Sequence, residues 1–293
     1  MTQQITVGLD GSPESRAAAD WAAREAGHRG LSVHLVHAWL LEPLTTPPTR
    51  DTAWSQKLLD EAAAELTERH PGVTVTTGPV SATATVGLLE QEDNSEMIVL
   101  GSRGRGALVG FLVGSIGLRV LARAKKPVVL VREEEARAAA TAGSEIVVGV
   151  EDLDGPAAAP LDFAFSTAKT RGDTVRAVHA LHHRDRSGRL EEEIARVRGG
   201  HDDDKSLADA LSQAKEQLSA ALAPWRERYP DVQVTEDVRP GNAAEVLLTG
   251  ASEAALVTVG RRTERPALSP RIGSVAHAVL HHSAAPVAVI AYS

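Results

Sequence analysis

Residues 5–15 read ITVGLDGSPES, and residues 146–156 read IVVGVEDLDGP. Each stretch runs from β-branched residues into a glycine, and an acidic residue stands two positions further on, Asp10 in the first and Glu151 in the second. A short β-branched run that ends in turn-forming residues is typical of a strand and the loop after it. The sequence therefore begins the same structural unit twice.

The repetition continues in the same order along both halves. The matching pairs are VHAW at 36–39 with VHAL at 178–181, HPGVTV at 70–75 with YPDVQV at 229–234, VLGSRG at 99–104 with VTVGRR at 257–262, and KPVVLV at 126–131 with APVAVI at 285–290. A chain of 293 residues also fits two domains of typical size. We expect domains at residues 1–135 and 144–293, joined through the charged, alanine-rich segment 133–145.

Short apolar runs alternate with longer amphipathic stretches in each half. The strands expected from these runs are residues 5–9, 32–38, 73–77, 97–100 and 128–131, and then 146–150, 174–180, 232–235, 255–259 and 287–290. Runs such as MIVL and PVVLV are apolar at consecutive positions, as parallel strands covered on both faces must be. The predicted fold class is therefore α/β and Rossmann-like, with two tandem doubly wound parallel sheets of five strands in the order 3-2-1-4-5.

The last strand of each half is expected at a sheet edge. PVVLV at 127–131 and PVAVI at 286–290 are apolar and carry no charged residue that would guard such an edge. Exposed edges of this kind pair with other strands, so these two should pair with each other or with another chain. We expect a homodimer formed through these last strands.

Composition excludes several classes of protein. Cysteine is absent, which removes disulfides, thiolate metal ligands and a cysteine nucleophile, and fits a reducing cytoplasm. The first residues lack a signal-peptide pattern and no run of ~18 apolar residues occurs, so we expect neither secretion nor a membrane span. A net charge of -8 argues against nucleic acid as a partner.

A strongly charged insertion, residues 182–205, separates the second strand of the second half from the helix after it. It holds His182, His183 and His201 beside three aspartates, but with no fixed ligand spacing on a helix. We interpret it as a solvated loop and expect no metal site.

The fourth strand of the first half leads into GSRGRGALVGFLVGS, residues 101–115. Its glycines and last serine form the pattern G-x2-G-x9-G-S, made by Gly101, Gly104, Gly114 and Ser115, with Arg103 inside the loop. Glycines here permit positive φ and let amide groups approach an anion, and the apolar run after Ser115 indicates a helix whose N-terminus favours negative charge. Phosphate is the natural anion. The alternative is that the glycines only form tight turns and Ser115 only caps its helix.

The position of this loop in the fold favours a ligand. In open α/β sheets, ligands bind beyond the carboxyl ends of the strands where the strand order reverses, here between the first and fourth strands. Asp10 ends the first of them. The loop lacks the lysine of a Walker motif, and no G-x-G-x-x-G follows the first strand, so two other phosphate motifs are excluded.

Together, Asp10 at the end of VGLD, VHAW on the second strand and the glycine loop resemble the universal stress protein family, twice over nearly the whole chain. The resemblance implies an adenine nucleotide alpha hydrolase-like fold and the family branch that binds ATP, with or without Mg²⁺. It also implies site roles: Asp10 near the ribose, the backbone of Ala38 near adenine, and phosphate ligands at Gly101, Arg103, Gly104, Gly114 and Ser115.

The second half keeps only part of this pattern. Gly260, Gly273 and Ser274 stand at matching distances, but Thr263 replaces the middle glycine and Glu151 replaces the aspartate. A Cβ restricts positive φ at Thr263, while the arginines of this loop could hold phosphate through their side chains. Occupancy of this second site stays open, and we expect the first site to bind more tightly.

Three functions remain in competition. The first is a stress-response signalling or regulatory module in which bound ATP changes conformation or partner choice. The second is a slow ATPase or kinase, for which Asp10 is the one acidic candidate tied to the loop. The third is a structural interaction protein that nucleotide stabilises.

Overall fold

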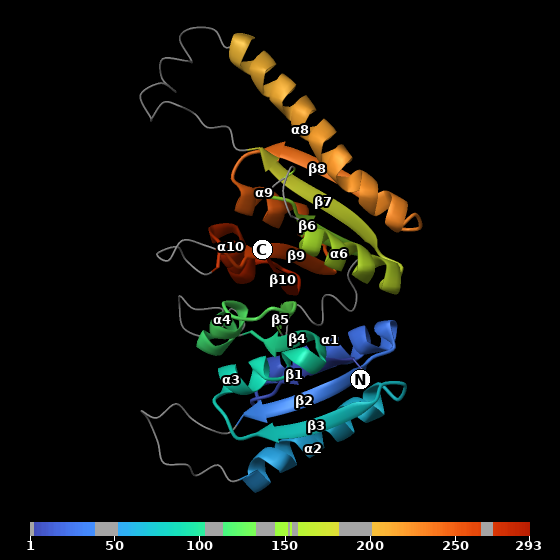
Figure 1. Cartoon of the computed structure of the whole chain (residues 1–293), viewed down its shortest axis with the longest axis vertical. Helices are drawn as coiled ribbons and strands as arrows, with labels where there is room; N and C mark the ends of the chain where they lie inside the picture. Colours follow the sequence, from blue (N-terminus) through green and yellow to red (C-terminus); the bar gives the residue numbers. More distant parts are fainter. Residues whose placement is uncertain are drawn as a thin grey trace.

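Figure 1 shows the computed structural model of the chain as a stack of strands, with the first half of the sequence below and the second half above. The structure describes residues 3–38, 52–102, 114–132, 144–151, 153, 158–181, 201–264 and 272–293. Its strands form one sheet of ten in the order β3-β2-β1-β4-β5-β10-β9-β6-β7-β8. Each half therefore has the predicted order 3-2-1-4-5, and the predicted α/β class is confirmed.

The first half alternates strands with helices. Its elements are β1 (Gln4–Gly8), α1 (Pro13–Arg29), β2 (Ser32–Ala38), α2 (Thr52–Arg69), β3 (Val75–Val80), α3 (Ala84–Leu89), the 3-10 turn η1 (Glu92–Asn94), β4 (Ser95–Gly101), α4 (Ser115–Leu121) and β5 (Val128–Val131). Helix α1 is capped by Ser12, whose side chain accepts a hydrogen bond from the Ser15 amide, and Pro13 is its first residue. The helix ends at Gly30, which has a left-handed conformation.

The second half repeats this pattern, and its second described helix is longer than the second helix of the first half. Its elements are β6 (Glu145–Gly149), α6 (Ala158–Arg171), β7 (Thr174–Leu181), α8 (His201–Arg228), β8 (Val234–Pro240), α9 (Ala243–Gly250), β9 (Leu256–Arg262), α10 (Ser274–His282) and β10 (Val287–Tyr292). One expectation is corrected here. His201 and the aspartates after it lie in the first turns of α8 rather than in a loop, while residues 182–200 lie outside the described residues.

The two halves join through their last strands. β5 and β10 pair antiparallel, with Val287 opposite Leu130 and Val289 opposite Val128. The predicted pairing of these strands with each other is confirmed. Both edges of each strand are now occupied, since β5 also pairs with β4 and β10 with β9. The strand edges through which a homodimer was expected are therefore already used within the chain.

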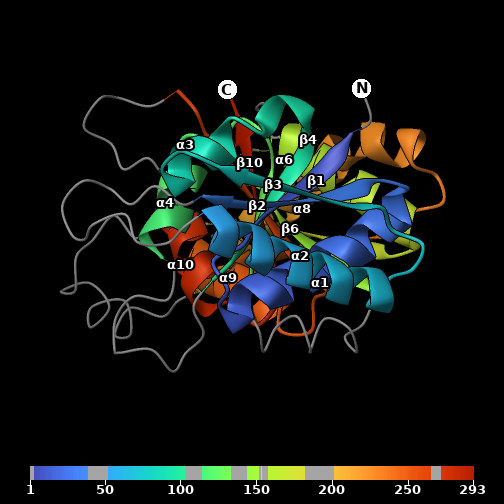
Figure 2. The ribbon, with the colours of Figure 1, turned by 90° about the horizontal axis from the view of Figure 1, so that it is seen from below.

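Two continuous cores follow from this joined sheet. Figure 2, viewed along the stack of strands, shows helices on both sides of it. One core gathers side chains from α1, α2, α6 and α8, and includes the fully buried Phe165 and Leu59. The other gathers side chains from α3, α4, α9 and α10, and includes Leu121 and Leu280. Each core contains residues of both halves, so apolar burial holds the halves together.

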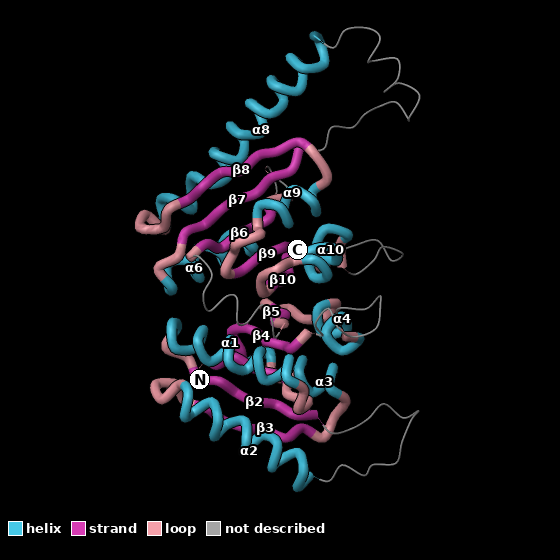
Figure 3. The backbone as a smooth tube through the Cα atoms, turned by 180° about the vertical axis from the view of Figure 1, so that it is seen from behind, coloured by secondary structure: helices cyan, strands magenta, loops and turns pink. Residues whose placement is uncertain are grey.

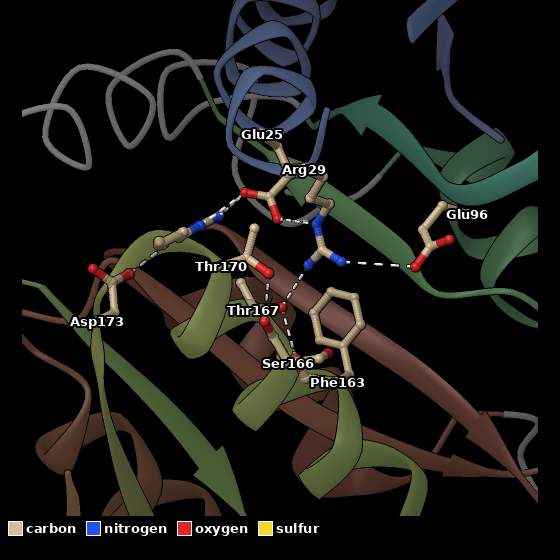
Figure 4. Close-up of polar contacts among 9 residues, drawn as sticks. Glu25, Arg29, Glu96, Phe163, Ser166, Thr167, Thr170 and Asp173 are labelled. Carbon is tan, nitrogen blue, oxygen red and sulfur yellow. Dashed lines mark hydrogen bonds and ion pairs between the residues drawn. The ribbon is translucent and has the colours of Figure 1, made fainter. Parts of the chain in front are cut away.

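A charged cluster also crosses the junction between the halves (Figure 4). Glu25 of α1, whose side chain is 1% exposed, pairs with Arg29 on its own helix and with Arg171 of α6 at 2.7 Å. Arg29 donates to the hydroxyl of Thr167 at 2.7 Å and lies over the ring of Phe163.

Within the described part of the chain, no helix is both long enough and apolar enough to cross a lipid bilayer.

Candidate functional site

A cavity of about 450 Å³ opens at the carboxyl ends of β1, β2 and β4. It lies at the point where the strand order reverses, since β1 pairs with β2 on one side and with β4 on the other. The residues that line it are Gly8, Leu9, Asp10, Ser12, Glu14, Ser15, Val36, His37, Ala38, Ala84, Leu88, Leu100, Gly101, Gly114, Ser115, Ile116 and Gly117. Of the predicted residues, Asp10, Ala38, Gly101, Gly114 and Ser115 thus share one cavity.

Asp10 forms one wall of the cavity and is held in place by the turn after it. Its Oδ1 accepts bonds from the Ser12 amide at 2.9 Å and from the Ser12 hydroxyl at 2.5 Å, and its own amide donates to Ser15 Oγ at 3.4 Å. Partial burial opposes the charged form of this carboxyl, but the bonds from Ser12 and Ser15 outweigh it and lower the pKa of Asp10. The site therefore contains a fixed carboxylate at neutral pH.

The wall beside Asp10 is the end of β2, which contributes His37 and Ala38. His37 is buried, and its Nδ1 bonds the Leu9 carbonyl at 2.6 Å while its ring meets Trp54 edge to face at 5.3 Å. This contact ties the end of β2 to the residue just before Asp10. His37 was not predicted as a site residue. Its repetition in VHAW and VHAL is a signal that could have indicated it, because His179 bonds the Val150 carbonyl in the same way.

The opposite wall is the start of α4. Gly114 is the residue before the helix, it makes no side-chain cap, and the first helical bond runs from the Leu118 amide to the Gly114 carbonyl at 3.1 Å. The amides of residues 115–117 therefore have no partner within the helix. The alternative in which Ser115 caps its helix is wrong, because Ser115 is the first helical residue.

Gly101 and Gly114 differ in what the protein requires of them. A Cβ at Gly101 would lie 2.5 Å from the Glu14 carbonyl carbon and 2.6 Å from the Ser15 amide nitrogen, so close packing of β4 on α1 demands glycine there. Among the residues that the structure describes, none comes within 4 Å of a Cβ placed at Gly114. Neither glycine has positive φ, which corrects the reason given from the sequence. Arg103 and Gly104 lie outside the described residues.

The corresponding cavity of the second half measures about 110 Å³. It is lined by Gly149, Val150, Glu151, Val178, Ala180, Ala243, Leu247, Val259, Gly260, Val275 and Ala276. Glu151 and Gly260 therefore come together as predicted. Thr263, Gly273 and Ser274 are not among the lining residues.

Tyr292, at the end of β10, lies beside Gly260 and Glu151, two residues that line this smaller cavity. A Cβ at Gly260 would lie 2.5 Å from the Tyr292 ring, so the ring covers this glycine. The Tyr292 hydroxyl donates to Glu151 at 3.4 Å, and its carbonyl accepts bonds from the amide of Thr263 at 2.7 Å and from its hydroxyl at 3.1 Å. Two of the residues expected to meet a ligand here, Glu151 and Thr263, are bonded to Tyr292 instead.

The comparisons with known proteins decide the family. Residues 1–132 and 144–291 both match the family described as "Universal stress protein family". This chain belongs to the universal stress protein family. A universal stress protein of Mycobacterium tuberculosis is 32% identical over 298 residues, which cover 97% of this chain and 96% of that one.

A solved structure that matches the whole chain agrees with this assignment at the level of the fold. The crystal structure of a universal stress protein from Archaeoglobus fulgidus DSM 4304 has a TM-score of 0.67 and 16% identity, and the match covers 100% of both chains. A second universal stress protein was solved in complex with cAMP; it has 23% identity and a TM-score of 0.37, and the match covers 44% of this chain and 97% of that one.

The larger cavity of this universal stress protein offers two kinds of polar group on opposite walls. One wall carries the ionised carboxylate of Asp10, which accepts hydrogen bonds from hydroxyl groups. The other carries the amides of residues 115–117 at a helix start, which favour an anion. Apolar side chains, among them Val36 and Leu88, complete the lining. These groups suit a ligand that carries both hydroxyl groups and an anionic group, together with an apolar part.

Proposed function

We propose that this universal stress protein binds ATP in the cavity of its first domain and acts as a signalling or regulatory module in a stress response. The observation that supports this most is the pairing of a fixed carboxylate with a helix start across a cavity of about 450 Å³. That volume falls within the range of about 300–1,000 Å³ that is usual for small-molecule sites. Membership of the family supports the same ligand class.

Each part of ATP has a proposed partner. The ribose hydroxyls donate to Asp10, the backbone of Ala38 faces adenine, and the amides at Gly114 and Ser115 bind phosphate. Gly101, Arg103 and Gly104 complete the phosphate loop in this proposal. Mg²⁺ would accompany the phosphates as a counter-ion, as it commonly does with nucleotides.

The second site is proposed to bind nucleotide weakly or not at all. Its residues would be Glu151, Gly260, Thr263, Gly273 and Ser274. The cavity beside the first two is about 110 Å³, and Tyr292 already bonds Glu151 and Thr263.

Three further proposals concern the whole chain. Domain boundaries at 1–135 and 144–293 agree with the two matched segments. A cytoplasmic location is supported by the absence of cysteine. Homodimerisation also stays a proposal, and it requires a surface other than the β5 and β10 edges, which pair with each other. Light scattering of the purified chain tests it, and a monomer at every concentration would contradict it.

The test of ATP binding is the variant Gly114→Glu. Gly114 lies beside open space with φ -62°, so glutamate fits the backbone, but its carboxylate would repel phosphate. At an effective dielectric of about 20, two charges about 4 Å apart repel by about 4 kcal/mol, so calorimetry should show a loss of affinity of about 100-fold or more.

The matched control is Gly72→Glu, because Gly72 also has nothing within 4 Å of its Cβ position and is exposed outside the cavity. It should bind ATP like the wild type. If Gly114→Glu bound ATP with the same affinity as the wild type, the proposed phosphate site would be contradicted. Release of inorganic phosphate from bound ATP, measured on the same samples, separates an ATPase from a binding module.

A further inference from the structure

The helices α4 and α10 lie next to each other where the two domains meet, as Figures 1 and 3 both show. Helix α4 starts at the nucleotide cavity of the first domain, and α10 starts at the equivalent position of the second. The carboxyl end of each helix is contacted by an arginine of the other domain. These two contacts are the ones on which the inference depends.

Arg261 makes the contact to α4. It follows Gly260 near the carboxyl end of β9 in the second domain, and is only 5% exposed. Its guanidinium donates to the carbonyl of Ala124, in the turn directly after α4. That turn is itself tied to the helix, because the Ala124 amide donates to the Val120 carbonyl at 2.8 Å.

Arg132 makes the contact to α10. It follows β5 in the first domain, is 4% exposed, and donates to the carbonyls of Ser283, at 2.9 Å, and Leu280. The two arginines do not occupy equivalent positions in the repeat. Ser102 stands in the first half where Arg261 stands in the second, and Ala291 stands where Arg132 stands.

Helix α4 needs such an anchor because it is short. It has seven residues, and a helix of about two turns has little stability of its own, so tertiary contacts fix its direction. Val120 and Leu121 fix its apolar face against the core. The guanidinium of Arg261 bonds the Ala124 carbonyl just beyond the end of the helix, where its charge also opposes the negative end of the helix dipole.

We propose that Arg261 is a positioning residue for the first nucleotide site, so that the second domain sets the phosphate affinity of the first. This inference rests on the proposed function. The divergent loop of the second domain then has a role without binding nucleotide itself: its arginine holds the helix whose first residues line the other cavity. Removing the guanidinium frees the carboxyl end of α4 and displaces amides 115–117 from phosphate.

The experiment compares ATP and adenosine binding by calorimetry in the full-length chain and in Arg261→Met, whose side chain retains apolar bulk. We expect the affinity for ATP to fall about tenfold, as for one lost charge-assisted hydrogen bond. The affinity for adenosine, which has no phosphate, should stay within about twofold because the Asp10 and Ala38 walls are unchanged. Arg261→Lys, which keeps a charge and a donor, should restore part of the ATP affinity.

Arg132→Met is the matched control, since it removes the same kind of buried bond at α10. It should lower the thermal unfolding midpoint much as Arg261→Met does, yet leave ATP affinity unchanged. Equal loss of ATP affinity in both variants, equal loss of ATP and adenosine binding, or unchanged ATP affinity in Arg261→Met would overturn the inference. A wild-type chain that binds no ATP would overturn the proposed function, and this inference with it.

Discussion

Gly101 and Gly114 line the same cavity, but the surrounding protein constrains these two glycines differently. Asp10, Ala38, Gly101, Gly114 and Ser115 line one cavity, although they are separated along the chain. The sequence pattern assigned both glycines to phosphate, but Gly101 has a packing requirement against Glu14 that only coordinates reveal. A pattern of glycines indicates positions at which a side chain is excluded. It does not indicate whether the protein or a ligand occupies the space.

This distinction gives a stability prediction. Gly101→Ala should lower the free energy of unfolding by about 1–3 kcal/mol, because overpacking forces backbone apart at the Glu14 contact. Gly114→Ala meets no described atom at an ordinary φ, so it should cost less than about 1 kcal/mol, the penalty for alanine in place of glycine just before a helix. Urea titration followed by circular dichroism measures both, and similar stabilities for the two variants would count against the packing role of Gly101.

At the scale of secondary structure elements, the sequence predicted the central strands best. Predicted 5–9 and 128–131 correspond to β1 (Gln4–Gly8) and β5 (Val128–Val131), which are apolar and covered on both faces. The outer strands were displaced: 73–77 became β3 (Val75–Val80) and 232–235 became β8 (Val234–Pro240). Both are edge strands whose outer parts carry polar residues and proline, which edges tolerate and apolar-run criteria overlook.

The contact of α1 with α6 supports a second prediction, about Glu25. Burial opposes its charged form, but Arg171 and Arg29 outweigh burial and lower its pKa below 4.5. A lowered carboxyl pKa contributes stability that is present above the unfolded pKa and is lost as pH falls through the folded pKa. Glu25→Gln should lose about 3 kcal/mol of unfolding free energy at pH 7, because it removes the buried carboxylate charge that Arg29 and Arg171 share.

The variant should also lose the part of the acid sensitivity below pH 4.5 that Glu25 contributes. Its control is Glu65→Gln, which breaks an exposed pair with Arg16 at 3.3 Å. Surface pairs contribute about 0–1 kcal/mol, so this control should be nearly as stable as the wild type. Urea titrations at pH 7 and pH 4 measure both effects; equal losses in the two variants would contradict the structural role of the α1–α6 cluster.

At the scale of the whole molecule, the sequence predicted two repeated domains and left their assembly open. An unguarded apolar edge accepts any strand, so PVVLV and PVAVI could pair within the chain or between chains. The antiparallel pairing of β5 with β10 and the two shared cores resolve this within one chain. The same joining places α4 and α10 side by side, an arrangement that no local pattern contains.

The two joined domains should bind nucleotide unequally. The first cavity measures about 450 Å³ and the second about 110 Å³, below the usual range of about 300–1,000 Å³ for small-molecule sites. The glutamate that replaces Asp10 in the second domain is not held by an adjacent serine turn; it accepts a bond from Tyr292, whose ring also covers Gly260. A ligand that bonded Glu151 or Thr263 would compete with the bonds that these two residues make to Tyr292.

We therefore expect titration of the whole chain with ATP to show one strong site, removed by Gly114→Glu and kept by Gly273→Glu. Arginines in the second loop could in principle compensate through side-chain contacts with phosphate, each contributing about 1.5–3 kcal/mol. Arg261 donates to the Ala124 carbonyl instead, and Arg262 donates to the Tyr292 hydroxyl at 3.1 Å. Both guanidinium groups therefore already make hydrogen bonds within the protein. Equal losses from the two glutamate substitutions, or two strong sites in the wild type, would refute the asymmetry.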